Sequence, residues 1–407
     1  MTALWTEADR WAAARTMLVA GSLILAISLG ARHSFGLFLQ PVSLENGWGR
    51  ETFAFAIALQ NLVWGAAQPF AGALSDRFGA GRVILGGAVL YALGLALMAV
   101  PQDGAMFALS AGVLIGLGLS GTTFPVVFGA ISRAVPAEKR SLAMGLSMSV
   151  GSFGQFAMLP LALGLIDGFG WAAALLALSA LAALILPLGL FLREPPRGAG
   201  GLPALAAGAA LRQALGARDF WLLSLGFFVC GFQVVFIAVH LPAFLADEGL
   251  GAGVATAVLA LIGLVNVAGT YCAGLWGGRR SKPALLAWIY LGRAVAIAAF
   301  VALPVTEWSA YAFGATMGLF WLSTVPLTNG VVASVFGVGN MAMLGGVVFF
   351  MHQLGSFLGG WLGGRVYDQT GSYELVWWSA VGLSLVAALL HAPIRETPVA
   401  ERAPRTA

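Results

Sequence analysis

The chain has 407 residues, of which 59% are hydrophobic and only 9% are charged. An ordinary soluble domain has about 25% charged residues, so this composition leaves too little polar surface to cover the protein in water. The net charge of +4 at pH 7 needs no nucleic-acid partner, because the positions of the basic residues explain it. We therefore expect the lipid bilayer to be the solvent and exclude an ordinary soluble enzyme.

The apolar residues form runs of about 20 or more, the length that a helix needs to cross a bilayer. Short segments between the runs hold nearly all of the charged residues, as in multi-pass membrane proteins. Twelve spans are predicted: Thr16–Val42, Thr52–Ala73, Arg82–Val100, Met106–Ala130, Ser141–Ile166, Trp171–Leu192, Phe220–Ala246, Ala255–Trp276, Pro283–Leu303, Trp308–Phe336, Met341–Gly363 and Leu375–Pro393. The fold class is therefore an all-α membrane protein, and an even number of spans places both termini on one side.

The basic residues predict which side that is. Of 21 Lys and Arg residues, all but Arg32, Arg50, Arg293 and Arg365 lie at the chain ends or in the even-numbered loops. Positive charge is retained in the cytoplasm, so we expect cytoplasmic termini and a location in the bacterial inner membrane. The first span is expected to be retained and not removed as a signal peptide, because Arg32 lies at its middle and no A-x-A-like cleavage site follows.

The chain divides into two similar halves. The longest polar interruption, Arg193 to Asp219, predicts a central linker with a short surface helix around Leu211–Leu215. We expect residues 1–192 and 220–407 to form two six-helix bundles, joined by the linker 193–219.

Four short patterns recur about 200 residues apart, which indicates a parallel duplication of six helices. The pairs are Gly30-Ala-Arg32 with Pro41 and Gly231-Phe-Gln233 with Pro242, Thr123-Phe-Pro125 and Thr324-Val-Pro326, Gly72 and Gly274, and Gly151-Ser-Phe153 and Gly355-Ser-Phe357. Such a duplication places a substrate site between the halves, near the middle of the membrane.

The segment Gly72-Ala-Leu-Ser-Asp76-Arg77-Phe-Gly79-Ala-Gly81-Arg82, after the second span, resembles the G-x-x-x-D-R-x-G-x-R signature of the major facilitator superfamily. The resemblance implies two pseudo-symmetric bundles, alternating access and a gating role for Gly72, Asp76, Arg77 and Arg82. Physically, Gly72 permits close helix approach and Asp76 can complement the N-terminus of a neighbouring helix. The second-half copy has Gly278 where the aspartate would be, so we expect this lock on one side only.

Two further segments resemble the monocarboxylate and oxalate–formate branch of that superfamily. They are Arg32-His33-Ser34-Phe35-Gly36-Leu-Phe-Leu with Glu45-Asn-Gly-Trp48-Gly-Arg50, and His352-Gln353-Leu-Gly355-Ser-Phe-Leu-Gly359 with Gly363-Gly364-Arg-Val-Tyr-Asp368-Gln-Thr-Gly371-Ser-Tyr373. In that branch His33 aligns with a lysine that takes part in proton and substrate coupling. The branch also has an Asp and Arg pair on helix 8, whereas Asn266 and Thr270 stand at the matching positions here.

The charged or titratable residues inside the spans are Arg32, His33, His240, Arg293 and His352, with no Asp or Glu among them. A charge near the bilayer centre costs at least about 2.5–3.5 kcal/mol, so each of these is a candidate functional residue. Basic groups without a carboxylate favour an anionic substrate. For Arg293, a supporting contact to helix carbonyls is the favoured interpretation. For His240, a structural hydrogen bond or gate role and contact with the ligand are equally open.

Arg32 is the predicted substrate-binding cation, with snorkelling to an interface or bonding to helix carbonyls as the alternative. His33 and His352 are the candidates for proton coupling, and an interhelical hydrogen bond is the alternative for His352. The full predicted substrate-binding set is Arg32, His33, Gln233, His352, Gln353, Thr123, Gln155, Asn266 and Trp321. Supplementary polar candidates include Gln60 and Asn61.

These observations predict a secondary transporter for a small organic anion, a mono- or dicarboxylate, with proton coupling left open. A proton-driven exporter of drugs or other amphipathic compounds is the alternative, disfavoured because such exporters commonly use a membrane-embedded carboxylate. A transporter-like sensor would need an output domain. No cofactor, metal site, catalytic residue or nucleic-acid partner is predicted, no P-loop occurs in the sequence, and a monomer is expected.

Overall fold

The computed structural model describes residues 7–48, 50–100, 103–192 and 205–399, and within these ranges every regular element is a helix. Eleven helical segments of this part of the chain are long and apolar enough to cross a membrane. The 29-residue helix α3 (Arg50–Phe78) is not among the eleven, and it carries the polar residues Gln60, Asn61 and Gln68 along its length. Most predicted spans agree with observed helices to within a few residues.

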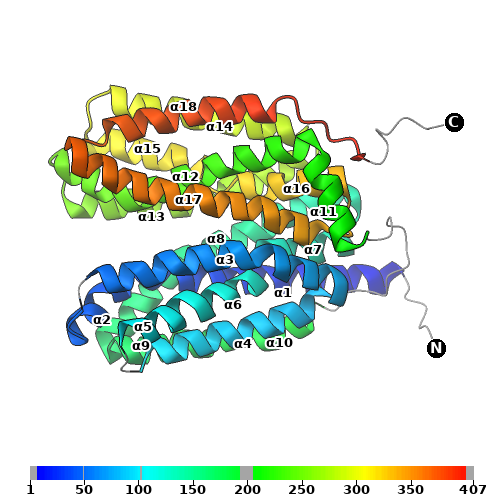
Figure 1. The fold of residues 1–407 in the computed structure, drawn as a ribbon, viewed down its shortest axis with the longest axis horizontal. Coiled ribbons are helices and arrows are strands. Elements are labelled where there is room, and N and C mark those ends of the chain that lie inside the picture. Colours follow the sequence, from blue (N-terminus) through cyan, green and yellow to red (C-terminus); the bar gives the residue numbers. More distant parts are fainter. Residues whose placement is uncertain (1–6, 49, 101–102, 193–204, 400–407) are drawn as a thin grey trace.

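The elements of the first half form one bundle, drawn in blue and cyan in Figure 1. Besides α3 they are α1 (Glu7–His33), η1 (Ser34–Phe38), α2 (Leu39–Glu45), α4 (Ala80–Met98), α5 (Gly104–Phe107), η2 (Ala108–Leu114), α6 (Ile115–Thr122), α7 (Phe124–Ala134), α8 (Ala137–Phe169), α9 (Trp171–Ala183) and α10 (Ile185–Leu190).

The second half forms a bundle beside the first (Figure 1). Its helices are α12 (Arg218–Asp247), α13 (Ala252–Gly277), α14 (Lys282–Ala302), α15 (Glu307–Phe320), α16 (Thr324–Phe336), α17 (Met341–Thr370) and α18 (Glu374–His391). The predicted linker helix is present as α11 (Ala207–Gly216), while linker residues 193–204 lie outside the described residues. In Figure 1, α1 begins and α18 ends at the same end of the molecule as α11.

The repeated Thr-x-Pro pattern breaks one span in each half. The fourth span is interrupted at Thr123, whose backbone is extended between α6 and α7, and the tenth is interrupted between Phe320 and Thr324. In each case the proline falls in the first turn of the helix that follows, where its missing N–H costs nothing. The sequence predicted continuous spans here, but the duplicated prolines instead start new helices at equivalent places.

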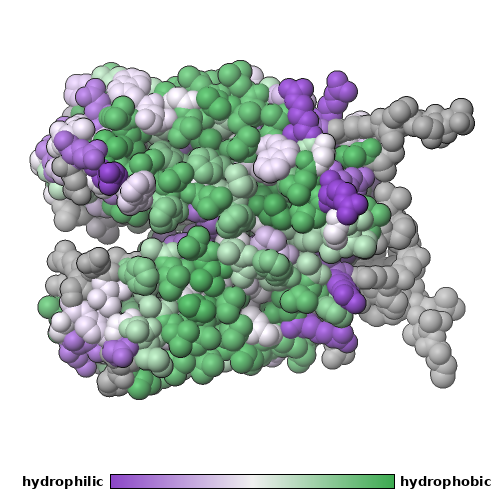
Figure 2. Space-filling model, viewed as in Figure 1, coloured by the Kyte–Doolittle hydropathy of each residue, from purple (hydrophilic) through white to green (hydrophobic). Residues whose placement is uncertain are grey.

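The two bundles touch along two antiparallel pairs of helices, α3 with α17 and α8 with α13. Glycines allow the closest approach. A Cβ atom at Gly72 would lie 2.2 Å from the carbonyl oxygen of Ala342, and one at Gly145 would lie 2.4 Å from the Cα atom of Gly274. Both contacts lie toward the end where α1 begins, whereas Figure 2 shows a hollow between the bundles at the opposite end. The molecule is therefore closed at one end and open at the other.

The glycine contact between α8 and α13 gives a first prediction. Gly145→Ala places a methyl group against the backbone of Gly274, so we expect a loss of about 1–3 kcal/mol in the stability of this closed form. Thermal unfolding in detergent measures it. The matched control is Gly164→Ala on the same helix, where a Cβ atom meets nothing within 4 Å and helix propensity predicts a small gain. Equal behaviour of the two variants would contradict this account of the interface.

Candidate functional site between the two helix bundles

Arg32 lies in the last turn of α1, where the helix carbonyls favour a positive charge. Its side chain reaches α3. An Nη2 hydrogen is donated to Oδ1 of Asn61, and the guanidinium carbon lies 5.0 Å from the ring centroid of Trp64, in cation–π geometry. The Nε atom is buried and has no hydrogen-bond partner within the described residues. The Nε–H group of Arg32 is therefore a free buried donor, and the groups that hold the guanidinium, Asn61 and Trp64, are neutral.

The second bundle meets this cation through α17. The side-chain amide of Gln353 donates to the carbonyl oxygen of Asn61 at 3.2 Å and to its Oδ1 atom at 3.5 Å. Nδ1 of His352 lies 3.3 Å from Oε1 of Gln353 and 3.4 Å from the hydroxyl of Ser356. A continuous polar network thus runs from Arg32 through Asn61 to Gln353 and His352, and it joins the two halves.

Aromatic rings enclose this network. The ring of Trp64 lies 4.9 Å from that of Phe349 and 6.1 Å from that of Phe124, between centroids. His352 is stacked on Phe349 at 5.5 Å and lies 4.7 Å from Phe227. The rings come from α3, α7, α12 and α17, so both halves contribute. Such a wall gives the site an apolar lining next to a single cation.

Thr123, at the break between α6 and α7, contacts the indole of Trp64 in the aromatic wall. The indole N–H of Trp64 lies within hydrogen-bond distance of Oγ1 of Thr123 (3.1 Å) and of Oε1 of Gln68 (3.0 Å). The Thr123 hydroxyl itself lies 3.2 Å from Oε1 of Gln68 and 2.7 Å from the carbonyl oxygen of Leu119. The helix break therefore fixes the orientation of the ring on which Arg32 rests.

At the closed end, Asp76 joins the halves by capping a helix that is not its own. Its carboxylate accepts the backbone N–H groups of Ala342, at 3.3 Å, and Met343, at 2.8 Å, in the first turn of α17. It also forms an ion pair of 2.7 Å with Arg133 of α7. A carboxylate at a helix N-terminus satisfies free N–H groups and complements the helix dipole.

The predicted second span ended before Asp76. Contrary to the prediction, Gly72 and Asp76 lie within α3 and not in a loop, because α3 continues to Phe78.

Comparison with known proteins identifies the fold. Residues 21–360 match the family described as the Major Facilitator Superfamily. The chain belongs to the major facilitator superfamily. It is therefore a multi-pass membrane transporter and not an enzyme.

Relatives with curated names include monocarboxylate transporter 11 of Mus musculus, which is 31% identical over 372 residues, covering 86% of this chain and 80% of the relative. A Bacillus subtilis protein named as an uncharacterized MFS-type transporter, YcxA, is 24% identical over 94% of both chains. Among solved structures, the FucP transporter in its outward conformation has a TM-score of 0.69 at 16% identity, covering 93% of this chain and 98% of that one. The proton:xylose symporter XylE gives 0.72 at 16% identity, covering 93% and 95%.

Gln233, the repeat partner of Arg32, does not belong to the polar network that runs from Arg32 to His352. It is fully buried among α12, α14 and α18, where its amide nitrogen donates to the carbonyl oxygen of Ala380 at 2.9 Å and to the hydroxyl of Ser384. Its Oε1 atom accepts a hydrogen bond of 3.2 Å from Arg293. Its side-chain hydrogen bonds are thus inside the second bundle, and its contact with substrate stays a prediction.

Arg293 is fully buried and serves the break in the tenth span. Its guanidinium donates to the carbonyl oxygens of Phe320, at 2.6 Å, and Trp321, at 2.5 Å, at the C-terminal end of α15. It also lies 3.5 Å from the thiol of Cys230. The predicted supporting contact to helix carbonyls is therefore what the structure shows. Trp321, predicted as a substrate residue, is buried beside this contact and supplies a carbonyl to it.

Three other predicted site residues lie apart from the network. Asn266 is buried between the halves, where it donates to the hydroxyl of Ser152 at 2.9 Å and accepts from the N–H of Leu322 at 2.9 Å. His33 is exposed and Gln155 is partly buried, and neither has a hydrogen bond within the described residues. The predicted gating residues Arg77 and Arg82 are likewise exposed.

Sequence reasoning did not single out Trp64 and Gln68, and it placed Asn61 only among supplementary candidates. Their spacing in the sequence does indicate a shared helix face. Asn61, Trp64 and Gln68 follow one another at steps of three and four, which puts them on one face of a helix. That face contacts Arg32, Thr123 and α17.

The Asp76 contact gives a second prediction. Asp76→Asn keeps the size of the side chain but removes the charge that holds Arg133 and the start of α17, so the closed end should open more often. Charge-assisted hydrogen bonds of about 1.5–3 kcal/mol correspond to at least about a tenfold change. The rate at which a maleimide modifies a cysteine placed at the buried Ser75, in a Cys272→Ala background, reports this opening.

The control is Asp247→Asn, an exposed aspartate at the C-terminal end of α12. It should leave the modification rate at position 75 unchanged. A rate in Asp76→Asn no higher than in this control would show that Asp76 does not hold the closed end.

Proposed function

We propose that this protein is a secondary transporter that moves a small organic anion, a monocarboxylate in the first instance, by alternating access. The observation that carries the proposal is Arg32, a cation between the bundles. Among the described residues its partners are neutral, and its buried Nε donor has none. Within the described residues no carboxylate contacts it. A substrate carboxylate would supply the missing charge.

The energetics favour such a ligand. Keeping a cation at this depth without an ion pair costs several kcal/mol, and an anion that forms two parallel N–H···O bonds with a guanidinium offsets much of that cost. Asn61 and Trp64 hold the guanidinium in place while the site is empty. A carboxylate can then replace the contact with Asn61 and use the Nε donor as well.

The single cation and the aromatic wall also indicate the kind of anion. A monocarboxylate matches one guanidinium, whereas a second carboxylate would face the rings of Trp64 and Phe349. The named relatives that are monocarboxylate transporters support the same class. The alternative exporter would carry drugs or other amphipathic compounds, which would also suit an aromatic wall, but the positive charge of Arg32 opposes those that are cations.

Proton coupling is part of the proposal, with His352 as the first candidate and His33 as the second. His352 contacts Gln353, whose amide reaches Asn61, so protonation of the imidazole would act on the group that holds Arg32. Asn266 and Thr270 are neutral and form hydrogen bonds to Ser152 and Ser149 of α8. The pair of charged residues typical of the related branch therefore has no counterpart at these positions, and the histidines would carry the proton.

We further propose the topology predicted from the basic residues: twelve spans, with α3 as the twelfth, and both termini in the cytoplasm of a bacterium. The closed end with Asp76 is then cytoplasmic, and the described conformation faces outward. In this arrangement residues 1–192 and 220–407 are the two moving bundles, 193–219 is their linker, and Gly72 and Asp76 are the gating residues. A monomer suffices, because both halves of the site come from one chain.

The anion proposal is tested with Arg32→Gln and Arg32→Lys in proteoliposomes. Uptake of a panel of monocarboxylates and dicarboxylates is measured alongside neutral and cationic compounds. Arg32→Gln should weaken binding of the transported anion by roughly thirtyfold, because a desolvated charge pair is worth about 2 kcal/mol or more, and Arg32→Lys should recover part of it. Arg279→Gln, an exposed arginine between α13 and α14, is the control. Uptake of cations only, unaffected by Arg32→Gln, would favour the exporter.

Coupling to protons is tested separately with His352→Gln. If this imidazole carries the proton, an imposed pH gradient should accelerate uptake in the native protein and have little effect in the variant, while binding of the anion at one fixed pH persists. Uptake by the variant that still follows the gradient would remove His352 from the mechanism. The same measurement on His33→Gln then decides the second candidate.

A further inference from the structure

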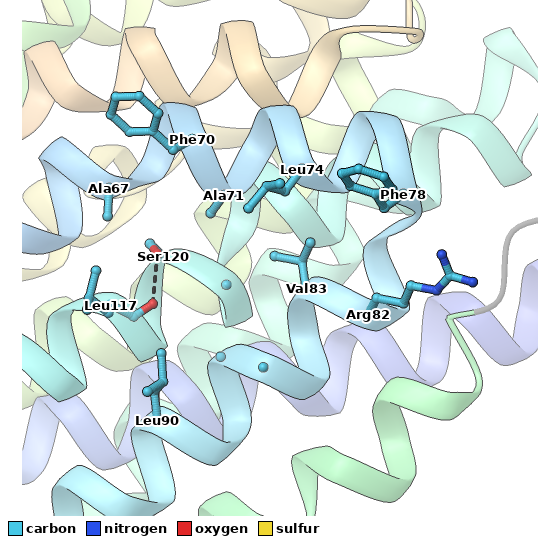
Figure 3. A pocket seen from close by; sticks show the side chains of 13 residues that line it. Ala67, Phe70, Ala71, Leu74, Phe78, Arg82, Val83, Leu90, Leu117 and Ser120 are labelled. Atoms are coloured by element: carbon cyan, nitrogen blue, oxygen red, sulfur yellow. Dashed lines mark hydrogen bonds between the residues drawn. The ribbon is translucent and has the colours of Figure 1, made fainter.

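A groove with a volume of about 590 Å³ lies on the outside of the first bundle, between α3, α4 and α6 (Figure 3). Its walls are apolar side chains: Phe70, Leu74 and Phe78 of α3, Val83 and Leu90 of α4, and Leu117 of α6. Phe70 is 72% exposed and Leu74 is 50% exposed. In a membrane protein such side chains face lipid, so hydrocarbon chains can enter the groove from the side.

The bottom of the groove is formed partly by small residues, which leave room for a chain. A Cβ atom at Gly86 would meet nothing within 4 Å. Apart from one arginine, Ser120 is the polar side chain of the lining, and its hydroxyl is already used in a hydrogen bond of 2.7 Å to the carbonyl oxygen of Leu117. The groove therefore offers nothing that a polar ligand could bind along its length.

One end of the groove is positively charged. Arg82 lies there beside Phe78, with its guanidinium pointing outward (Figure 3). It is exposed and has no ion pair or hydrogen bond within the part of the chain that the structure describes. Arg77 adds a second cation close by, because its guanidinium carbon lies 5.0 Å from the centroid of the Phe78 ring. The carboxylate of Asp76 does not neutralise them, since it is bound to Arg133 and α17.

We propose that this groove binds an anionic phospholipid, with an acyl chain between α3, α4 and α6 and the headgroup phosphate at Arg82 and Arg77. An apolar channel that ends in two cations matches a molecule with a hydrocarbon chain and an anionic head, and a guanidinium pairs well with phosphate. Basic residues at the ends of spans meet the headgroup layer, which puts the two ligands at the right depth.

Such a lipid would support the gate from the side. Leu74 and Phe78 line the groove, while Gly72 and Asp76 on the same two turns of α3 contact α17. A bound lipid fills the space on one side of this helix segment and so favours the position in which Asp76 caps α17. The site is separate from the Arg32 network and does not depend on which substrate is transported.

The test titrates delipidated full-length protein with phosphatidylglycerol or phosphatidylcholine of identical acyl chains and counts bound lipids by native mass spectrometry. The native protein should prefer phosphatidylglycerol. Arg82→Gln should weaken phosphatidylglycerol by about fivefold and leave phosphatidylcholine unchanged, because a cation near the surface contributes about that factor. Gly86→Leu places its Cβ atom where nothing lies within 4 Å, so its side chain should occupy the groove and weaken both lipids.

Two controls match these variants in the second half of the chain. Arg279→Gln removes an exposed arginine, and Gly382→Leu fills a position on α18 where a Cβ atom also meets nothing within 4 Å. Both should bind lipid as the native protein does. Equal affinity for the two lipids in the native protein would overturn the proposal. So would a preference for phosphatidylglycerol that Arg82→Gln leaves unchanged, or binding of both lipids that Gly86→Leu leaves unchanged. A dimer that Gly86→Leu abolishes would assign the groove to a second copy of the chain instead.

Discussion

The cap that Asp76 places on α17 is the contact on which the closed end of the molecule depends. The residue that precedes α17, Asn340, does not cap it, because its side chain binds the backbone of Leu205 in the linker. The N–H groups of Ala342 and Met343 would therefore lack partners without Asp76. A helix of one half is completed only by a residue of the other, so separating the halves at this end must replace charged hydrogen bonds with water.

That cap is one end of a continuous seam between α3 and α17. Moving back along α3 from Asp76, Gly72 meets Ala342, Gln68 meets Gly346, Trp64 meets Phe349 and Asn61 meets Gln353. The last of these pairs holds Arg32. Both helices are stiff and closely packed. We therefore expect a change in the contacts of Arg32 at one end of the seam to change the tilt of α3 relative to α17 at the other end. The geometry therefore connects the proposed anion site to the Asp76 contact without any intermediate loop.

The sequence predicted the architecture well and the side-chain partners poorly. Spans, linker helix and duplication could be read from hydrophobic runs and repeated Thr-x-Pro patterns, because these act on the backbone directly. Gln233 is an example of side-chain partners that the repeat did not predict. The repeat pairs it with Arg32, but its amide forms hydrogen bonds with Arg293 of α14 and Ser384 of α18, inside the second bundle. Trp64 was overlooked because an apolar residue in a predicted span is ordinary by itself, and only its spacing from Asn61 and Gln68 indicated a shared face.

The two arginines inside the spans differ in how fully their guanidinium groups are hydrogen-bonded. Arg293 uses its guanidinium on the carbonyls of Phe320 and Trp321 and on Gln233, so the ends of a broken helix already supply its negative counterpart. In the part of the chain that the structure describes, Arg32 has one amide oxygen, one ring face and a buried Nε atom with no acceptor. In the sequence the two residues look alike, because each is an arginine inside a predicted span. Only the count of unsatisfied donors, which requires side-chain geometry, separates Arg32, where we propose the anion, from Arg293 at the helix break.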